Sequence, residues 1–207
     1  LKAPKQKHFP HLSVEQIPDF LKALNDYPGS MITRIATKLL MITGLRTIEL
    51  RASEWSDIDF EKGIWQIPAE RMKMRRPHIV PLSSQARELL EEIHQLTGRG
   101  RYVFHGRNDA GKPMSEASIN QVIKRIGYDG KATGHGFRHT LSTILHEQGY
   151  NSAWIETQLA HVDKNSIRGT YNHAQYLEGR RTMLQDYADY LDALERGVNV
   201  VHGMYGK

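Results

Sequence analysis

Apolar residues recur every three or four positions over most of the chain, a spacing typical of helices that bury one face. The segment from Ser13 to Gln16 has the pattern of a capping box, and Leu12 and Ile17 are placed to form its hydrophobic staple. We therefore predict a helix that begins there and ends near residue 27. The same spacing predicts further helices at 31–42, 46–53, 84–96, 115–126, 135–148, 151–160, 166–172 and 176–196.

The pattern changes between residues 57 and 82, where three short segments have the character of strands. These segments are 57–60, 63–68 and 78–82, with a turn at 61–63 between the first two. A basic run separates the second from the third, which makes that run the tip of a hairpin. We predict a mainly helical α+β fold with a small three-stranded antiparallel sheet.

The two ends of the chain differ in character from its middle. Residues 1–12 contain three lysines and two prolines and are interpreted as an extended linker, 13–196 as one domain, and 197–207 as a flexible tail. The chain does not begin with Met, so we expect a piece of a longer protein. No apolar run is long enough for a transmembrane helix, and the first residues lack the hydrophobic region of a signal peptide. The absence of cysteine excludes disulfides and thiolate metal sites, and it fits a cytosolic protein.

Charge adds one local feature to this picture. The formal net charge is only +5, but Arg71, Lys73, Arg75 and Arg76 crowd together with no acidic residue among them. A basic stripe of this kind is expected where a protein contacts phosphates. Taken alone it is weak evidence, because a basic run is more often just a solvated loop.

Two motifs that suggest other chemistry are set aside. The segment 106–112 matches GxxxxGK, but Pro113 stands where a P-loop needs Ser or Thr to hold magnesium. We interpret it as a polar surface loop. His135 and His139 have the spacing of the two ligands in HExxH, but Gly136 replaces the glutamate, so we predict no metal site.

Other residues suit phosphodiester chemistry without a metal. Such a reaction needs cations against the non-bridging oxygens, a nucleophile and a proton donor for the leaving oxygen. Arg46 follows a tight Thr-Gly-Leu segment, and Arg138 lies three residues after His135, so that these two share a helical face. Taken alone, each arginine is more simply interpreted as a surface or salt-bridging residue.

Four segments occur together and in order: TGLRTIEL, RMKMRRPHIVPLS, HGFRHT and QLAHVDKNSIRGTYNHA. They resemble the signature boxes of the catalytic domain of the tyrosine recombinase (phage integrase) family, over about residues 12–194. The closing segment YNHAQYLEGRR is most similar to the integrases of prophages and genomic islands of enteric bacteria. The resemblance implies the tyrosine-recombinase catalytic fold and a site-specific recombinase that integrates or excises such an element through a 3′-phosphotyrosyl intermediate.

The resemblance also implies a role for each matching residue. Tyr171 would be the nucleophile, and Arg46 and Arg138 would clamp the non-bridging oxygens of the scissile phosphate. Lys73, at the hairpin tip, would give a proton to the departing 5′-oxygen. His135 would assist proton transfer.

Further roles follow in the same way. His161 would hydrogen-bond the phosphate, and Glu49 would support the basic site without touching DNA. The residues expected to contact DNA are Arg71, Arg75 and Arg76. At position 160 this chain has Ala where many relatives have Gly.

The family further implies cofactors, partners and location. No metal, ATP or other cofactor is expected. The expected partners are double-stranded DNA attachment sites, a homo-tetramer on DNA when the protein is full length, and a directionality factor, with no membrane. The expected location is the bacterial cytoplasm, at the nucleoid. Without upstream DNA-binding domains, this piece is expected to bind DNA weakly and in a salt-sensitive manner.

Several alternatives compete with these assignments. Tyr176 is the nearest rival nucleophile, but Tyr171 lies ten residues after the histidine of the LAH segment. Lys62 also lies at a turn and competes with Lys73. His139 is interpreted as structural, and His173 as a DNA contact or an inert residue. The rival functions are a type IB topoisomerase or telomere resolvase, and a DNA-binding accessory factor without turnover.

Overall fold

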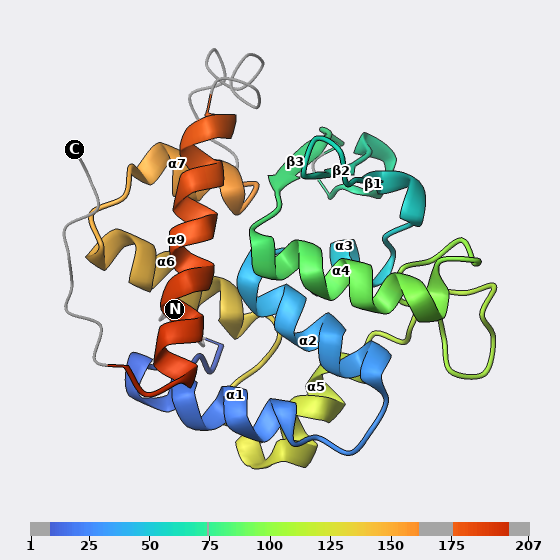
Figure 1. Cartoon of the computed structure of the whole chain (residues 1–207), viewed down its shortest axis with the longest axis horizontal. Coiled ribbons are helices and arrows are strands. Elements are labelled where there is room, and N and C mark those ends of the chain that lie inside the picture. The colour runs from blue at the N-terminus through green and yellow to red at the C-terminus, as the bar shows by residue number, and fades with distance from the viewer. Residues whose placement is uncertain (1–8, 74, 162–175, 199–207) are drawn as a thin grey trace, which may run out of the picture.

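A computed structural model describes residues 9–73, 75–161 and 176–198 (Figure 1). Its α-helices are α1 (Ile17–Asn25), α2 (Met31–Thr43), α3 (Thr47–Arg51), α4 (Ser84–Thr97), α5 (Ser118–Ile123), α6 (Gly136–Glu147), α7 (Ser152–Gln158) and α9 (Leu177–Glu195). Its strands are β1 (Ile58–Asp59), β2 (Ile64–Ile67) and β3 (His78–Pro81). Within the described residues, none of the helices is both long and apolar enough to cross a bilayer.

Helix α2 is the centre of the fold. It contacts α4, α5, α6 and α9, and its second half is buried from Ile35 to Thr43 apart from Lys38. The helix ends at Gly44, whose φ of +64° lies in the left-handed region and whose N–H donates to Leu40 O at 3.1 Å. A Cβ atom at Gly44 would also lie 3.0 Å from Leu141 Cδ1. Glycine therefore lets the chain leave a buried helix sharply, immediately before Arg46.

The sheet confirms the predicted hairpin. Its strand order is β1-β2-β3, all antiparallel, with Ile64 opposite Pro81 and Ile67 opposite His78. In Figure 1 the sheet lies above α4, and α9 stands to one side of both. The basic run connects β2 to β3 and contains a short 3-10 turn, η3 (Ala69–Arg71), that the sequence did not predict.

Apart from the one at 115–126, the predicted helices that lie in the described residues agree with the structure to within two residues at each end. Arg46 precedes α3 in an extended conformation (φ −75°, ψ 147°) and caps it instead of opening it. The helix predicted at 115–126 is α5 followed by a π-type turn, η4 (Lys124–Tyr128), because Gly127 adopts a φ of +90° that no α-helix accommodates. Helix α7 ends before the predicted residue 160, and the helix predicted at 166–172 lies outside the described residues.

The interpretation of the P-loop look-alike as a surface loop is confirmed. Residues 107–112, the P-loop look-alike, form an exposed loop. Trp65 is fully buried in the core, Trp55 donates its indole N–H to Thr97 O at 3.0 Å, and Trp154 is half-buried against Gly179.

Residues 9–12, which the sequence places in the linker, pack on α6. Leu12 is 2% exposed and its carbonyl accepts from Thr140 Oγ1 at 3.1 Å. The Pro10 carbonyl lies so close to the start of α6 that a Cβ atom at Gly136 would approach its oxygen to 2.0 Å. The glycine of the HGFRHT segment is therefore needed for the chain to pass at this point.

Replacing Gly136 by Ala is expected to lower the free energy of unfolding by about 1–3 kcal/mol, the usual range for overpacking a tight contact. The obstacle is backbone, which cannot swing aside like the end of a side chain. Chemical denaturation of the 207-residue chain measures the change. Gly111→Ala in the exposed loop is the matched control and should change stability by less than about 0.5 kcal/mol. Equal stability of the two variants would contradict this packing.

Candidate active site

Arg46 and Glu49 form the first part of the site. Because Arg46 caps α3, its backbone N–H donates to Glu49 Oε2 at 2.9 Å, and its Nη1 donates to Glu49 Oε1 at 2.7 Å. The Glu49 side chain is 1% exposed and that of Arg46 is 21% exposed. The buried carboxylate therefore fixes the orientation of a guanidinium that still reaches the surface, which is the geometry that a supporting residue requires.

Arg138 is the second cation and is almost completely buried. It lies in the first turn of α6, and its guanidinium donates to Gly44 O at 2.6 Å and to Leu159 O at 2.5 Å. Desolvation, and then the positive charge of Arg46, lower the pKa of Arg138 to about 10. The group remains cationic at neutral pH, and it joins the ends of α2 and α7 to α6.

The C-terminal end of α7 is the place where the two arginines meet. The helix closes with a Schellman motif, in which His161 N–H donates to Glu156 O at 3.0 Å and Ala160 N–H donates to Thr157 O at 3.1 Å. The motif leaves the carbonyls of residues 159 and 160 free. Arg138 binds the first, and Arg46 Nη2 donates to Ala160 O at 3.3 Å. The negative end of the helix dipole thus faces both cations.

The Schellman motif places Ala160 at a φ of +48°, in the left-handed region that favours glycine. A residue with a Cβ atom is strained by about 1–2 kcal/mol in this conformation. Glycine would relieve the strain, but its greater conformational freedom in the unfolded state offsets part of the gain. Ala160→Gly should therefore raise the free energy of unfolding by about 0.5–1 kcal/mol, as measured by chemical denaturation. The control, Ala153→Gly inside α7, should lower it by about 1 kcal/mol. A decrease for Ala160→Gly would contradict the left-handed geometry.

His161 lies at the edge of this cluster, with its side chain 46% exposed. Its Nε2 lies 3.2 Å from Arg138 Nη2, and its Nδ1 lies 2.7 Å from Glu156 Oε2. A guanidinium can only donate, so Nε2 is the acceptor and Nδ1 carries the proton that is donated to the carboxylate. The imidazole is therefore held in one tautomer with Nε2 directed at the arginine.

His135 immediately precedes α6, one turn before Arg138. Desolvation by the surrounding protein, followed by the charge of Arg138, lowers the pKa of His135 below its usual range. The ring is exposed to solvent on one side and contacts Phe9 on another, with 4.5 Å between ring centroids. His135 is accordingly neutral near pH 7, the state in which an imidazole accepts a proton.

Four predicted site residues are thus linked by hydrogen bonds: Arg46, Glu49, Arg138 and His161. They come from three separate segments of the sequence. His135 is close enough for the charges of this cluster to contribute to the lowering of its pKa. A model of the phage integrase family matches residues 10–178, a range that contains all of these segments.

The chain belongs to the phage integrase family. The integrase of Shigella phage Sf6 is 49% identical over 193 residues, which cover 93% of this chain and 50% of that protein. Prophage integrase IntS of Escherichia coli (strain K12) is 49% identical with the same coverage of both chains. The integrase-family chain described here therefore spans about half the length of the curated relatives it matches.

Solved structures confirm the predicted fold class. A lambda integrase dimer bound to a COC′ core site matches with a TM-score of 0.61 at 18% identity, over 87% of this chain and 62% of that one. XerA recombinase matches with a TM-score of 0.63 at 22% identity, over 76% of this chain and 58% of that one. The fold is the catalytic fold of tyrosine recombinases.

The nucleophile segment lies outside the described part of this integrase-family chain. Tyr171 and His173 both belong to residues 162–175, which connect His161 to the start of α9. The assignment of Tyr171 therefore stays a prediction. Its rival Tyr176 is half-buried and caps α9.

The basic hairpin contains residues with different surroundings. Lys73, Arg75 and Arg76 are exposed at the tip, and within the described residues Lys73 is not part of the hydrogen-bonded cluster. Arg71 instead bonds to Ala52 O and to Asp57, so its guanidinium is already occupied. The rival Lys62 bonds to Asp59 Oδ2 at 2.9 Å, which raises its pKa and makes it a poorer proton donor.

Two buried residues of the integrase fold were missed by the sequence interpretation. Arg180 in α9 is fully buried and donates to Gln158 Oε1 at 2.6 Å and to Ile79 O at 2.5 Å, and Gln158 Nε2 donates to Thr43 O at 2.7 Å. This network joins α2, α7, α9 and β3 next to the cluster. The available signal was the spacing of Arg180 from Met183 and Leu184, which places it on the apolar face of its helix.

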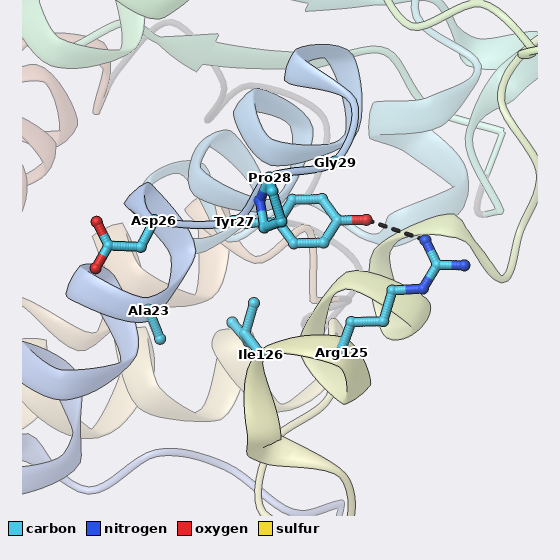
Figure 2. Close-up of a pocket in the computed structure, with 7 residues that line it drawn as sticks. All are labelled: Ala23, Asp26, Tyr27, Pro28, Gly29, Arg125 and Ile126. Carbon is cyan, nitrogen blue, oxygen red and sulfur yellow. Dashed lines mark hydrogen bonds between the residues drawn. The ribbon is translucent and has the colours of Figure 1, made fainter.

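One open pocket lies away from these residues, between the C-terminal end of α1 with the chain that follows it and the turn η4. Figure 2 shows Tyr27 and Arg125 across it, with Arg125 Nη1 donating to Tyr27 Oη at 3.2 Å. None of the predicted catalytic residues lines this pocket. It is therefore a separate surface feature.

Proposed function

We propose that this chain is the catalytic part of a tyrosine-type site-specific recombinase. It cleaves and rejoins double-stranded DNA through Tyr171 and thereby integrates or excises a prophage or genomic island. The observation that supports this most strongly is the convergence of Arg46 and Arg138 at the end of α7. Two guanidinium groups from distant segments bind neighbouring carbonyls there, at residues 159 and 160, which precede the proposed nucleophile by 12 and 11 residues.

The paired arginines suit a phosphate. Arg138 donates to the carbonyls of residues 44 and 159, and Arg46 donates to the carbonyl of residue 160 as well as to the Glu49 carboxylate. The carbonyls are neutral acceptors. A phosphodiester offers two non-bridging oxygens that carry negative charge, and hydrogen bonds to a charged acceptor are about twice as strong. The pair would therefore bind the scissile phosphate and stabilise the charge that grows on it as the phosphorus becomes five-coordinate.

The covalent step has a defined balance of bonds and protons. The phenolic oxygen of Tyr171 attacks phosphorus, the bond from phosphorus to the 5′-oxygen breaks, and a 3′-phosphotyrosyl link forms. Neutral His135 takes the phenolic proton, which matters because a free tyrosine has a pKa of about 10. Lys73 gives a proton to the 5′-oxygen. His161 would donate a hydrogen bond to the phosphate from Nε2, which requires this nitrogen to release Arg138 and to carry a proton.

Resealing is the same reaction in reverse. The 5′-hydroxyl of a partner strand attacks the phosphotyrosyl phosphorus and releases Tyr171. The intermediate conserves the energy of the bond, so neither ATP nor a metal ion enters the proposed cycle. Exchange of strands between two sites gives recombination, for which four protomers would assemble on DNA with a directionality factor choosing between integration and excision. This chemistry fits a bacterial cytoplasmic protein that acts at the nucleoid.

The proposal is tested by recombination between two plasmids that carry the attachment sites flanking the element. The full-length protein should join them in the presence of EDTA, and Tyr171→Phe should abolish joining while Tyr176→Phe preserves it. Relaxation of any supercoiled plasmid without site preference would favour a topoisomerase. DNA binding without any joining would favour an accessory factor. Loss of activity in EDTA would contradict the metal-free mechanism.

A further inference from the structure

Arg71 belongs to the basic run by sequence but not by its surroundings. Its Nη1 donates to Ala52 O at 2.8 Å and its Nη2 donates to Asp57. The side chains of Arg71 and Asp57 are 22% and 6% exposed. Arg75 and Arg76, later in the same run, are exposed.

The acceptors of Arg71 are themselves held in place. The second oxygen of Asp57 accepts the backbone N–H of Glu54 at 2.8 Å. The Glu54 carboxylate accepts from Arg101 Nη2 at 2.9 Å and lies 3.9 Å from Arg71 Nη1. Residues 52–57 therefore form a rigid socket that receives the Arg71 guanidinium.

The socket joins the two halves of the proposed chemistry. It begins at Ala52, the residue that caps the C-terminal end of α3, and α3 is capped at its other end by Arg46. Arg71 lies two residues before Lys73. Through Ala52 and α3, Arg71 is therefore linked to Arg46, which is proposed to bind the phosphate. Through two residues of chain, it is linked to Lys73, the proposed proton donor.

We propose that Arg71 is a positioning residue, which fixes the base of the β2–β3 hairpin to α3 so that Lys73 is held at the departing 5′-oxygen. This inference rests on the proposed function and takes the place of the direct DNA contact expected for Arg71. An arginine is required because its planar fork donates to two acceptors in different directions. A lysine at this position would reach only one of them.

The test uses DNA in which sulfur replaces the bridging 5′-oxygen at the cleavage site. A thiol has a pKa of about 8.5, so the sulfur leaves as a thiolate and needs no proton donor. In the full-length protein, Lys73→Ala and Arg71→Ala should both slow single-turnover cleavage of oxygen DNA by about 10²-fold, the usual contribution of a general acid. Both variants should cleave sulfur DNA within a few-fold of the wild-type rate.

Two further variants keep the inference falsifiable if Arg71→Ala fails to fold. Arg71→Lys and Asp57→Asn each weaken the socket with a smaller change and should show the same selective rescue by sulfur. Arg76→Ala is the matched control, and it should weaken DNA binding without a difference between the two substrates.

The possible failures are distinguishable. If the wild-type protein forms no covalent product with either DNA, the proposed function is wrong. If Lys73→Ala is rescued by sulfur and the three socket variants are not, the inference alone is wrong. A loss of DNA affinity in Arg71→Ala, with the salt dependence reduced by about one phosphate contact, would instead make Arg71 a DNA-binding residue.

Discussion

Replacing Arg138 by Ala in the full-length protein is expected to lower the rate of DNA cleavage by about 10²–10³-fold, the usual effect of removing one donor to a developing negative charge. Arg138 is the more buried of the two clamping cations, and the lowered dielectric around it strengthens its interaction with a bound phosphate. Its pKa of about 10 leaves it charged at the pH of the assay. Single-turnover cleavage of attachment-site DNA measures the loss.

The matched control for Arg138 is Arg125→Ala, which removes an exposed-surface arginine bonded to Tyr27, far from the cluster. This variant should cleave DNA at a rate within about twofold of the wild-type rate. Arg138→Ala should also keep most of its DNA affinity, because the exposed basic residues of the hairpin are expected to supply other phosphate contacts. A cleavage rate within a few-fold of the wild type would contradict the clamp.

Arg46→Ala should combine a similar catalytic loss with a loss of stability. Removing the guanidinium takes one donor away from the Glu49 carboxylate, which is 1% exposed and which, within the described residues, also accepts from the backbone N–H of residue 46. Breaking a fully buried ion pair costs about 3–5 kcal/mol. Because Arg46 reaches solvent, we expect the free energy of unfolding to fall by less than this, by about 2 kcal/mol.

The double variant Arg46→Ala with Glu49→Gln separates the two effects. A neutral amide tolerates the buried position better than an unpaired carboxylate, so the double variant should regain at least about 1 kcal/mol of the free energy of unfolding. Its cleavage rate should stay as low as that of Arg46→Ala. Denaturation and cleavage assays on the same preparations measure both quantities. Equal stability of the single and double variants would contradict the buried-carboxylate explanation.

The sequence predicted local structure well because the deciding forces act over a few residues. Alternation of apolar residues located the hairpin from β2 to β3, and Gly44 and Gly98 marked the ends of α2 and α4. The local pattern of residues did not predict that Arg46 and Arg138 lie close together. Their proximity followed only from resemblance to a family, since nothing local to either arginine indicates the other.

Long-range contacts are where the sequence interpretation reached its limit. Arg71 looked like its basic neighbours, and its partners Ala52 and Asp57 could be found only once the hairpin was folded back on α3. Arg180 received no role from the sequence, yet it is fully buried and donates to Gln158. In both cases a charged side chain stabilises the tertiary structure, a role that composition and spacing cannot distinguish from surface charge.

The proposed mechanism requires the phenolic oxygen of Tyr171 to form a covalent bond to the scissile phosphate. Mapping the covalent product tests this requirement. DNA with a nick next to the cleavage site would trap the full-length protein on its substrate, and mass spectrometry of the digested product would locate the attachment. We expect a peptide joined through Tyr171 to a 3′-phosphate, with a free 5′-hydroxyl on the released strand. Attachment through another residue, a 5′-phosphate link, or trapping that persists in Tyr171→Phe would contradict it.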